Sequence, residues 1–210
     1  MMELEKIIAK KLLGLKAFRV QTLSPFTWAN GWKSPIYLDD RKILSYPNVR
    51  NFFKLELSHR VAEYFPDADV IAGIATNAIA HGVLVAEELA LPFVYVHPMP
   101  KDHGLENQVE GDLRPHQNVV IIENQVNVGS NVQKVIEAVQ SNGCNVLGVV
   151  TIFDYHLPSA VKRINAAGVE FLSLTNFDAL IEQAKAINLF SEEDIHILHE
   201  WHKAPSQWGK

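Results

Sequence analysis

From residue 69 onward, short apolar runs alternate with segments whose apolar residues recur at helical spacing. Short runs rich in Val and Ile predict buried strands, and the intervening pattern predicts helices with one apolar face. Strands and helices that alternate in this way are typical of an α/β fold with a mostly parallel sheet flanked by helices. We expect strands at 70–74, 93–96, 119–122, 146–153 and 169–174, and helices at about 79–89, 129–141 and 159–166.

The first 65 residues do not follow this rhythm. An amphipathic helix is expected within 1–18, an extended segment at 36–39, and a second helix that opens at Pro47. The stretch 176–201 also has a helical pattern. We therefore expect three parts: an N-terminal helix and hood segment (1–65), an α/β core (66–175), and C-terminal helices that pack on the core or the hood (176–210).

Composition and charge exclude several classes of protein. The formal net charge of -5 gives no overall basic field for nucleic acid or an anionic membrane. No apolar run approaches the roughly 20 residues that span a bilayer, and the N-terminus lacks the continuous apolar core of a signal peptide. Cys144 is the only cysteine, which suits a reducing compartment. We expect a cytoplasmic protein without nucleic-acid or membrane partners.

The stretch 119–130 is the most informative for function. An apolar strand ends at the acidic Glu123, passes through a short loop, and enters a helix at Gly129 and Ser130. Backbone N–H groups at such a helix start bind anions, and the Ser130 hydroxyl can add a hydrogen bond. The alternative is a tight strand-to-helix turn in which Gly129 relieves crowding and Ser130 caps the helix. The stretch alone does not decide between the two.

Two other loops could carry chemistry. The connection 97–110 is long for a link between strands, and its Lys101 and His103 could supply a positive charge and a proton donor to a leaving phosphate. The alternative is a solvated loop with incidental charges. The strand end at 73–79 contains small residues that allow a ligand to approach the backbone, although a simple turn explains it equally well.

Aromatic residues and histidines leave further alternatives open. The cluster of Phe26, Trp28, Trp32 and Tyr37 could stack a base, but aromatic residues this dense are more often core of a cap. Two histidines three residues apart near the C-terminus could bind a metal, but no third ligand is in view, so we expect no metal ligand from protein side chains.

Taken together, these stretches resemble the type I phosphoribosyltransferases, and most closely the orotate phosphoribosyltransferase family. The segment 34–37 (Ser-Pro-Ile-Tyr), with Asp40 and Arg41, is similar to that family's hood segment. The segment 101–104 (Lys-Asp-His-Gly) is similar to its catalytic loop. The stretch 119–130 has the position and shape of its motif for phosphoribosyl pyrophosphate (PRPP).

The resemblance implies a glycosyltransferase of pyrimidine biosynthesis. In its reaction orotate displaces pyrophosphate from PRPP, with Mg²⁺, to give orotidine monophosphate. It also implies a homodimer in which the loop 97–110 crosses into the partner's site. By this resemblance Lys101 and His103 would contact pyrophosphate, with His97 at the start of their loop, and Glu123 and Asn124 would contact the ribose. The 5′-phosphate would be bound by Asn127, Val128, Gly129 and Ser130. The pyrophosphate loop would consist of Ala75, Thr76, Asn77 and Ala78.

Two departures from the family pattern concern charge. The motif normally has two adjacent acids, whereas here Glu123 is followed by Asn124, which lacks a charge that would help bind the ribose. The catalytic loop normally begins with Arg, whereas here it begins with His97, which cannot replace a bidentate guanidinium.

Two further departures concern the backbone. Val128 is β-branched in a loop whose backbone must wrap a phosphate, and Ala78 stands where the family has Gly. The degenerate motif leaves two hypotheses: an orotate phosphoribosyltransferase with weakened or altered activity, and a non-catalytic relative that binds nucleotide, phosphate or a partner protein as a regulator. The accepted base is not fixed by the sequence, and no role is assigned to Tyr155 and His156 after the fifth strand.

Overall fold

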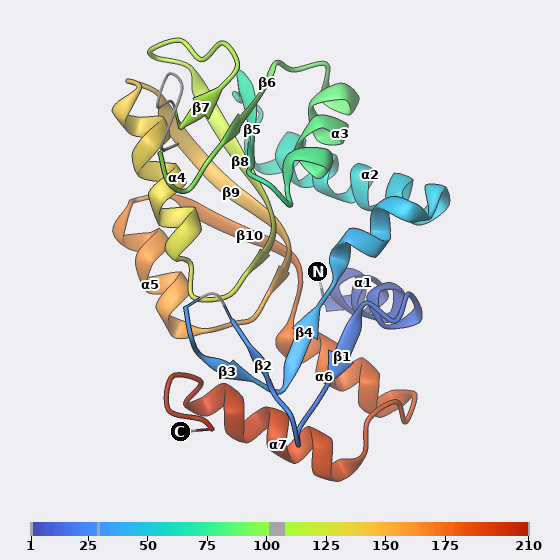
Figure 1. Ribbon diagram of the computed structural model, residues 1–210. Helices are drawn as coiled ribbons and strands as arrows, with labels where there is room; N and C mark the ends of the chain where they lie inside the picture. Colours follow the sequence, from blue (N-terminus) through green and yellow to red (C-terminus); the bar gives the residue numbers. More distant parts are fainter. Residues whose placement is uncertain (1, 29, 101–107, 210) are drawn as a thin grey trace.

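The computed structural model describes residues 2–28, 30–100 and 108–209, and its centre is one six-stranded sheet (Figure 1). The strand order is β10-β9-β8-β5-β6-β7. Every pair is parallel except β6 with β7, which run antiparallel. The predicted α/β fold is therefore confirmed. The strands are β5 (Val70–Ile74), β6 (Phe93–Val96), β7 (Val109–Glu110), β8 (Asn118–Val126), β9 (Asn145–Asp154) and β10 (Glu170–Asn176).

Helices cover both faces of this sheet (Figure 1). Successive side chains of a strand point to opposite faces, so alternate residues of β8 enter two separate cores. Val120 and Ile122 join a core with the helices α1 (Met2–Gly14), α2 (Pro47–Tyr64) and α3 (Ile79–Leu89). Val119 and Ile121 join a core with α4 (Ser130–Ser141) and α5 (Pro158–Ala166). Among the described residues, no helix is both long and apolar enough to cross a membrane.

The N-terminal and C-terminal segments meet at one end of the sheet (Figure 1). Here lie two small antiparallel ribbons, the 3₁₀ helix η1 and two helices. Trp201 is fully buried, donates its indole N–H to the Lys33 carbonyl at 3.1 Å, and packs edge-on against Trp28. These elements are β1 (Phe18–Val20) with β4 (Ile36–Leu38), β2 (Phe26–Thr27) with β3 (Lys33–Ser34), η1 (Asp40–Ser45), α6 (Phe177–Ala186) and α7 (Glu192–Lys203).

The structure differs from the sequence prediction in two places. The helical stretch expected at 176–201 is two helices, because Ser191 forms a capping box with Asp194 and starts α7 anew. The strand expected at 119–122 continues to Val126, because the long neighbouring β9 offers hydrogen-bond partners throughout. Glu123 therefore lies within the strand and not at its end.

We expect Trp201→Ala to lower the free energy of unfolding by about 3–5 kcal/mol, because it empties a large site and removes the donor to Lys33. The measurement is equilibrium unfolding in urea. A matched truncation on the exposed side of the same region, Leu189→Ala at 49% exposure, should change stability by no more than about 0.5 kcal/mol. Equal losses for the two variants would contradict the packing described.

Candidate functional site

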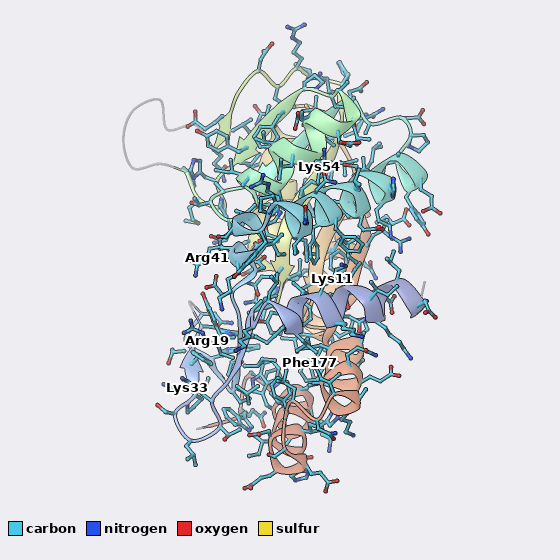
Figure 2. All side chains as sticks on the ribbon, turned by 90° about the vertical axis from the view of Figure 1, so that its right-hand side faces the viewer. Lys11, Arg19, Lys33, Arg41, Lys54 and Phe177 are labelled. Atoms are coloured by element: carbon cyan, nitrogen blue, oxygen red, sulfur yellow. The ribbon has the colours of Figure 1, made fainter. Side chains whose placement is uncertain are left out.

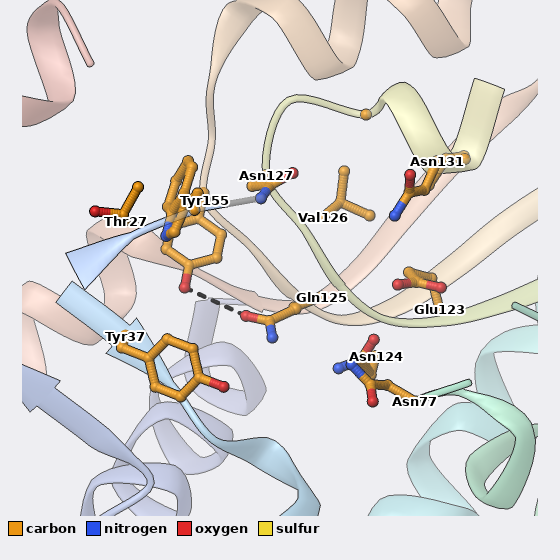
Figure 3. A pocket seen from close by; sticks show the side chains of 13 residues that line it. Thr27, Tyr37, Asn77, Glu123, Asn124, Gln125, Val126, Asn127, Asn131 and Tyr155 are labelled. Atoms are coloured by element: carbon orange, nitrogen blue, oxygen red, sulfur yellow. Dashed lines mark hydrogen bonds between the residues drawn. The ribbon is translucent and has the colours of Figure 1, made fainter. Parts of the chain in front are cut away.

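A cavity of about 270 Å³ lies at the carboxyl ends of the central strands (Figure 3). The strand order reverses between β5 and β8, since the chain continues from β5 to β6 on one side and from β8 to β9 on the other. Crevices at such switch points are the usual ligand sites of parallel α/β sheets. The lining residues are Thr27, Trp28, Tyr37, Asn77, Glu123, Asn124, Gln125, Val126, Asn127, Gly129, Asn131, Val132 and Tyr155.

Glu123 and Asn124 bring buried polar groups to this cavity. Glu123 is 9% exposed and Asn124 is 1% exposed. Glu123 Oε2 and Asn124 Nδ2 are buried and have no hydrogen-bond partner within the described part of the chain. Burial raises the pKa of the Glu123 carboxyl well above its ordinary value, and the nearby Asp40 carboxyl raises it further. Buried polar atoms without partners are costly, so they suit a ligand that supplies the missing hydrogen bonds.

The segment 127–130 forms a tight entry into α4. Gly129 is the helix N-cap with a φ of 76°, and a Cβ there would lie 2.9 Å from Ala160 Cα. Gln133 N donates to Gly129 O at 3.0 Å, which is the first helical bond, so the preceding N–H groups lack partners within the helix. The predicted relief of crowding by Gly129 is confirmed. The capping by Ser130 that the alternative interpretation predicts is wrong, because Gly129 is the N-cap and Ser130 is the first helical residue.

Val128 has a structural role that the sequence did not reveal. Its side chain is 7% exposed and packs into the core shared with α1 and α2. Its N–H donates to Asn127 Oδ1 at 2.6 Å, and its carbonyl accepts from Arg163 Nε at 3.0 Å. The buried side chain of Val128 thus fixes the turn to the core, and hydrogen bonds with Asn127 and Arg163 fix its backbone.

The strand end at 75–78 is also well defined. The peptide bond between Ala75 and Thr76 is cis, and Ala75 N donates to Val96 O at 2.8 Å. Ala78 is buried with a φ of -92°, in a region open to every residue, so this position does not require Gly. Asn77 is the one of these four residues that lines the cavity.

His97 lies where β6 leaves the sheet. Its backbone N donates to Gln108 O at 2.8 Å, and its ring packs edge-on against Tyr95 at 5.7 Å. These contacts close the base of the loop 97–110. Lys101 and His103 fall outside the described residues, so their roles stay predictions.

One wall of the cavity is aromatic (Figure 3). Tyr155 donates its hydroxyl to Gln125 Oε1 at 3.2 Å, and Gln125 Nε2 donates to the Leu38 carbonyl at 3.4 Å. Trp28 packs edge-on against Tyr155 with ring centroids 5.2 Å apart. Trp28 packs against the hydrophobic core, as the cap interpretation expects, and it also lines the cavity, so base stacking stays a prediction.

Sequence reasoning missed the role of Gln125 and assigned none to Tyr155. The partners of Gln125, Leu38 and Tyr155, come from distant parts of the chain, so no local sequence pattern would have identified its contacts. His156 makes no contact with the cavity and instead binds Asp178, with Nδ1 2.7 Å from Oδ2. His202 donates Nε2 to the Tyr155 carbonyl at 2.8 Å and stacks on Phe177, which is a structural role.

Comparison with known proteins agrees with this geometry, although no family model matches the sequence. An orotate phosphoribosyltransferase of Phocaeicola vulgatus is 50% identical over 208 residues, covering 99% of this chain and 98% of that protein. One of Listeria innocua is 43% identical over 209 residues, covering 100% of each.

Two solved structures share the fold. The orotate phosphoribosyltransferase of Aeropyrum pernix has a TM-score of 0.75 at 24% identity, covering 88% of this chain and 99% of that one. The UMP synthase of Leishmania donovani has a TM-score of 0.80 at 23% identity, covering 95% of this chain and 42% of that one. The sequence relatives, at much higher identity over the whole length, decide the assignment. The chain belongs to the orotate phosphoribosyltransferase family.

Proposed function

We propose that this protein transfers a phosphoribosyl group from PRPP to orotate in pyrimidine biosynthesis. In this reaction the bond between ribose C1 and the pyrophosphate oxygen breaks, and N1 of orotate bonds to C1 as its proton leaves. The observation that carries the proposal is one cavity with three features. The Glu123 carboxyl has a buried oxygen without a partner among the described residues, the side-chain amides of Asn124 and Gln125 lie beside it, and the start of α4 forms the rim. No observation on the described residues favours the non-catalytic alternative.

The 5′-phosphate fits the start of α4. The N–H groups of the first helical turn lack partners within the helix, and Gly129, Asn131 and Val132 line the cavity there. The helix dipole and these donors both favour an anion. We place the phosphate over the segment Asn127, Val128, Gly129 and Ser130, where the Asn127 and Ser130 side chains add polar atoms.

The ribose hydroxyls fit the side chains of Glu123 and Asn124. Glu123 Oε2 is a buried acceptor without a partner in the described chain, which a hydroxyl donor would satisfy. Positive charge develops on the ribose as pyrophosphate leaves. That charge favours the ionised form of Glu123, and the carboxylate then stabilises the transition state more than the ground state.

Pyrophosphate would leave toward the other rim of the cavity. We assign its contacts to the loop Ala75, Thr76, Asn77 and Ala78, to His97, and to Lys101 and His103 of the following loop. Mg²⁺ keeps several waters and binds substrate phosphates through oxygen, so when bound with PRPP it would neutralise the leaving group. Glu123 Oε2, which has no partner in the part of the chain that the structure describes, fits a hydroxyl or a metal-bound water at that substrate.

Orotate would then lie against the aromatic wall. Trp28 and Tyr155 offer ring faces and edges, and Gln125 offers an amide for the polar edge of the base. We further propose a cytoplasmic homodimer in which the loop 97–110 completes the partner's site.

The direct test is calorimetry with PRPP and Mg²⁺, followed by a turnover assay with orotate on the same sample. We expect binding and turnover together. Binding without formation of orotidine monophosphate would contradict the proposed activity, and no binding of PRPP would contradict the phosphate site as well.

We expect Lys101→Ala to lower turnover by about 10²- to 10³-fold, because it removes a positive charge that stabilises the leaving pyrophosphate. Initial rates with saturating PRPP measure this effect. Lys10→Ala removes the same charge from an exposed position on α1 and should leave the rate unchanged. Comparable rates in both variants would remove Lys101 from the proposed mechanism.

Gly129→Ala should weaken PRPP binding by about tenfold or more, comparable to the loss of a hydrogen bond to a charged group. The added Cβ meets backbone of Ala160, so the start of α4 must shift. Gly168→Ala is the matched control: its φ is 70°, but nothing lies within 4 Å of the added Cβ. It should cost about 1 kcal/mol of stability through backbone strain and leave PRPP affinity intact. Equal affinities for the two variants would argue against phosphate binding at α4.

A further inference from the structure

We propose that Asp40, contributed by the N-terminal segment, is the second acid of the site, and that it acts through Asn124 as a positioning residue. Asn124 stands where the motif normally has a second acid, and it carries no charge. Asp40 places a carboxyl behind it from a different part of the chain. The inference rests on the proposed function, because it concerns how the same cavity holds the ribose.

The segment that carries Asp40 is held firmly. Asp39 N donates to the Ala17 carbonyl at 2.8 Å as the chain leaves β4, and Asp40 begins η1. The Asp39 carboxylate is paired with Arg41 at 2.7 Å, and Arg41 points to the surface (Figure 2). Asp40 is 2% exposed, so of these neighbouring charged side chains it is the one turned into the protein.

Asp40 and Asn124 meet on one side of the sheet. Asn124 continues the alternation of Val120 and Ile122, whose core also contains Ile43 from η1. Asn124 lies close enough to Asp40 for its side chain to lower the pKa of that carboxyl, against the larger effect of burial, which raises it. The contact lacks the geometry of a fully formed hydrogen bond, because Asp40 Oδ2 and Asn124 Nδ2 are both buried without a partner among the described residues.

The surroundings of Asp40 make its burial expensive. The charged and titratable groups that act together with it are Asp39, Arg41, Glu123 and Tyr155. Burial raises the pKa of Asp40 to about 6. The folded protein therefore holds a carboxylate that is ionised at neutral pH at a cost in stability. Buried carboxyls that are neither neutralised nor replaced by an amide concentrate at functional sites.

The chemistry of the pair gives Asp40 a defined task. A carboxylate accepts hydrogen bonds only, so it can hold the Asn124 side chain by its Nδ2 donor. The Asn124 oxygen is then turned toward the cavity, where it can accept from a ribose hydroxyl beside Glu123. The Asp40 charge also lies close behind the neutral amide, where it favours positive charge on the ribose.

A charge-exchange cycle tests this arrangement. Asp40→Asn should lower kcat/KM at least about tenfold, within the range of coupling between contacting residues. Asn124→Asp alone crowds three carboxyls together and should also lower it. The double variant Asp40→Asn with Asn124→Asp returns one acid and one amide to the pair, and it should recover to within about threefold of the unmodified protein.

The control is Asp39→Asn, which removes the same charge one residue away and should change kcat/KM by no more than about twofold. Rescue in the double variant is the readout that a merely structural role of Asp40 would not produce. Asp40→Asn without an effect, or a double variant no better than the weaker single variant, would overturn the proposal.

Unfolding in urea provides a second readout that needs no turnover. At pH 7.5 the midpoint should be highest for Asp40→Asn, intermediate for the unmodified and double variants, and lowest for Asn124→Asp. The gain of Asp40→Asn should shrink as the pH falls through about 6 and vanish below about pH 3, because Asp40 is then protonated in both the folded and the unfolded state. If the unmodified protein does not turn over orotate, the proposed function is refuted. The order of the unfolding midpoints would still test the contact between Asp40 and Asn124, because it does not depend on turnover.

Discussion

The structure depends on the unequal lengths of the strands beside β8. β5 pairs with β8 only as far as the register of Gly73 with Ile122, whereas β9 accompanies β8 to Val126. Beyond Ile122, β8 therefore has a partner on one side and an open edge on the other. Pairing with β9 keeps the peptide groups of β8 in place up to Val126. The side chains of Glu123 and Gln125 line the cavity at the open edge. A rigid strand holds functional groups more precisely than a loop does.

The same geometry accounts for an unusual concentration of unsatisfied polar groups. Glu123, Asn124 and Asp40 each leave a buried side-chain atom without a partner among the described residues. Such atoms destabilise the folded state, and the two large apolar cores that flank the sheet offset this loss. A ligand with several hydroxyls can form hydrogen bonds with these groups. Relief of the unfavourable free energy of the unpaired atoms then adds to the affinity for the ligand.

The N-terminal segment lines part of the cavity, and the last helix supports this segment through packing. Trp201 of α7 is fixed by the Lys33 carbonyl and supports Trp28, which in turn meets Tyr155 from the end of β9. Residues from three distant parts of the chain thus form one aromatic cluster, of which Trp28 and Tyr155 line the cavity.

The sequence by itself determined the fold class, the order of the core strands and helices, and the motif at 119–130. These features rest on local patterns, namely runs of Val and Ile, helical spacing and a glycine before a helix. Only the tertiary structure decided that β8 reaches Val126, that Ala78 needs no glycine conformation, and that Val128 is a core residue. It alone brought Asp40 to Asn124, since 84 positions separate them along the chain and only the pairing and packing of distant elements make them neighbours.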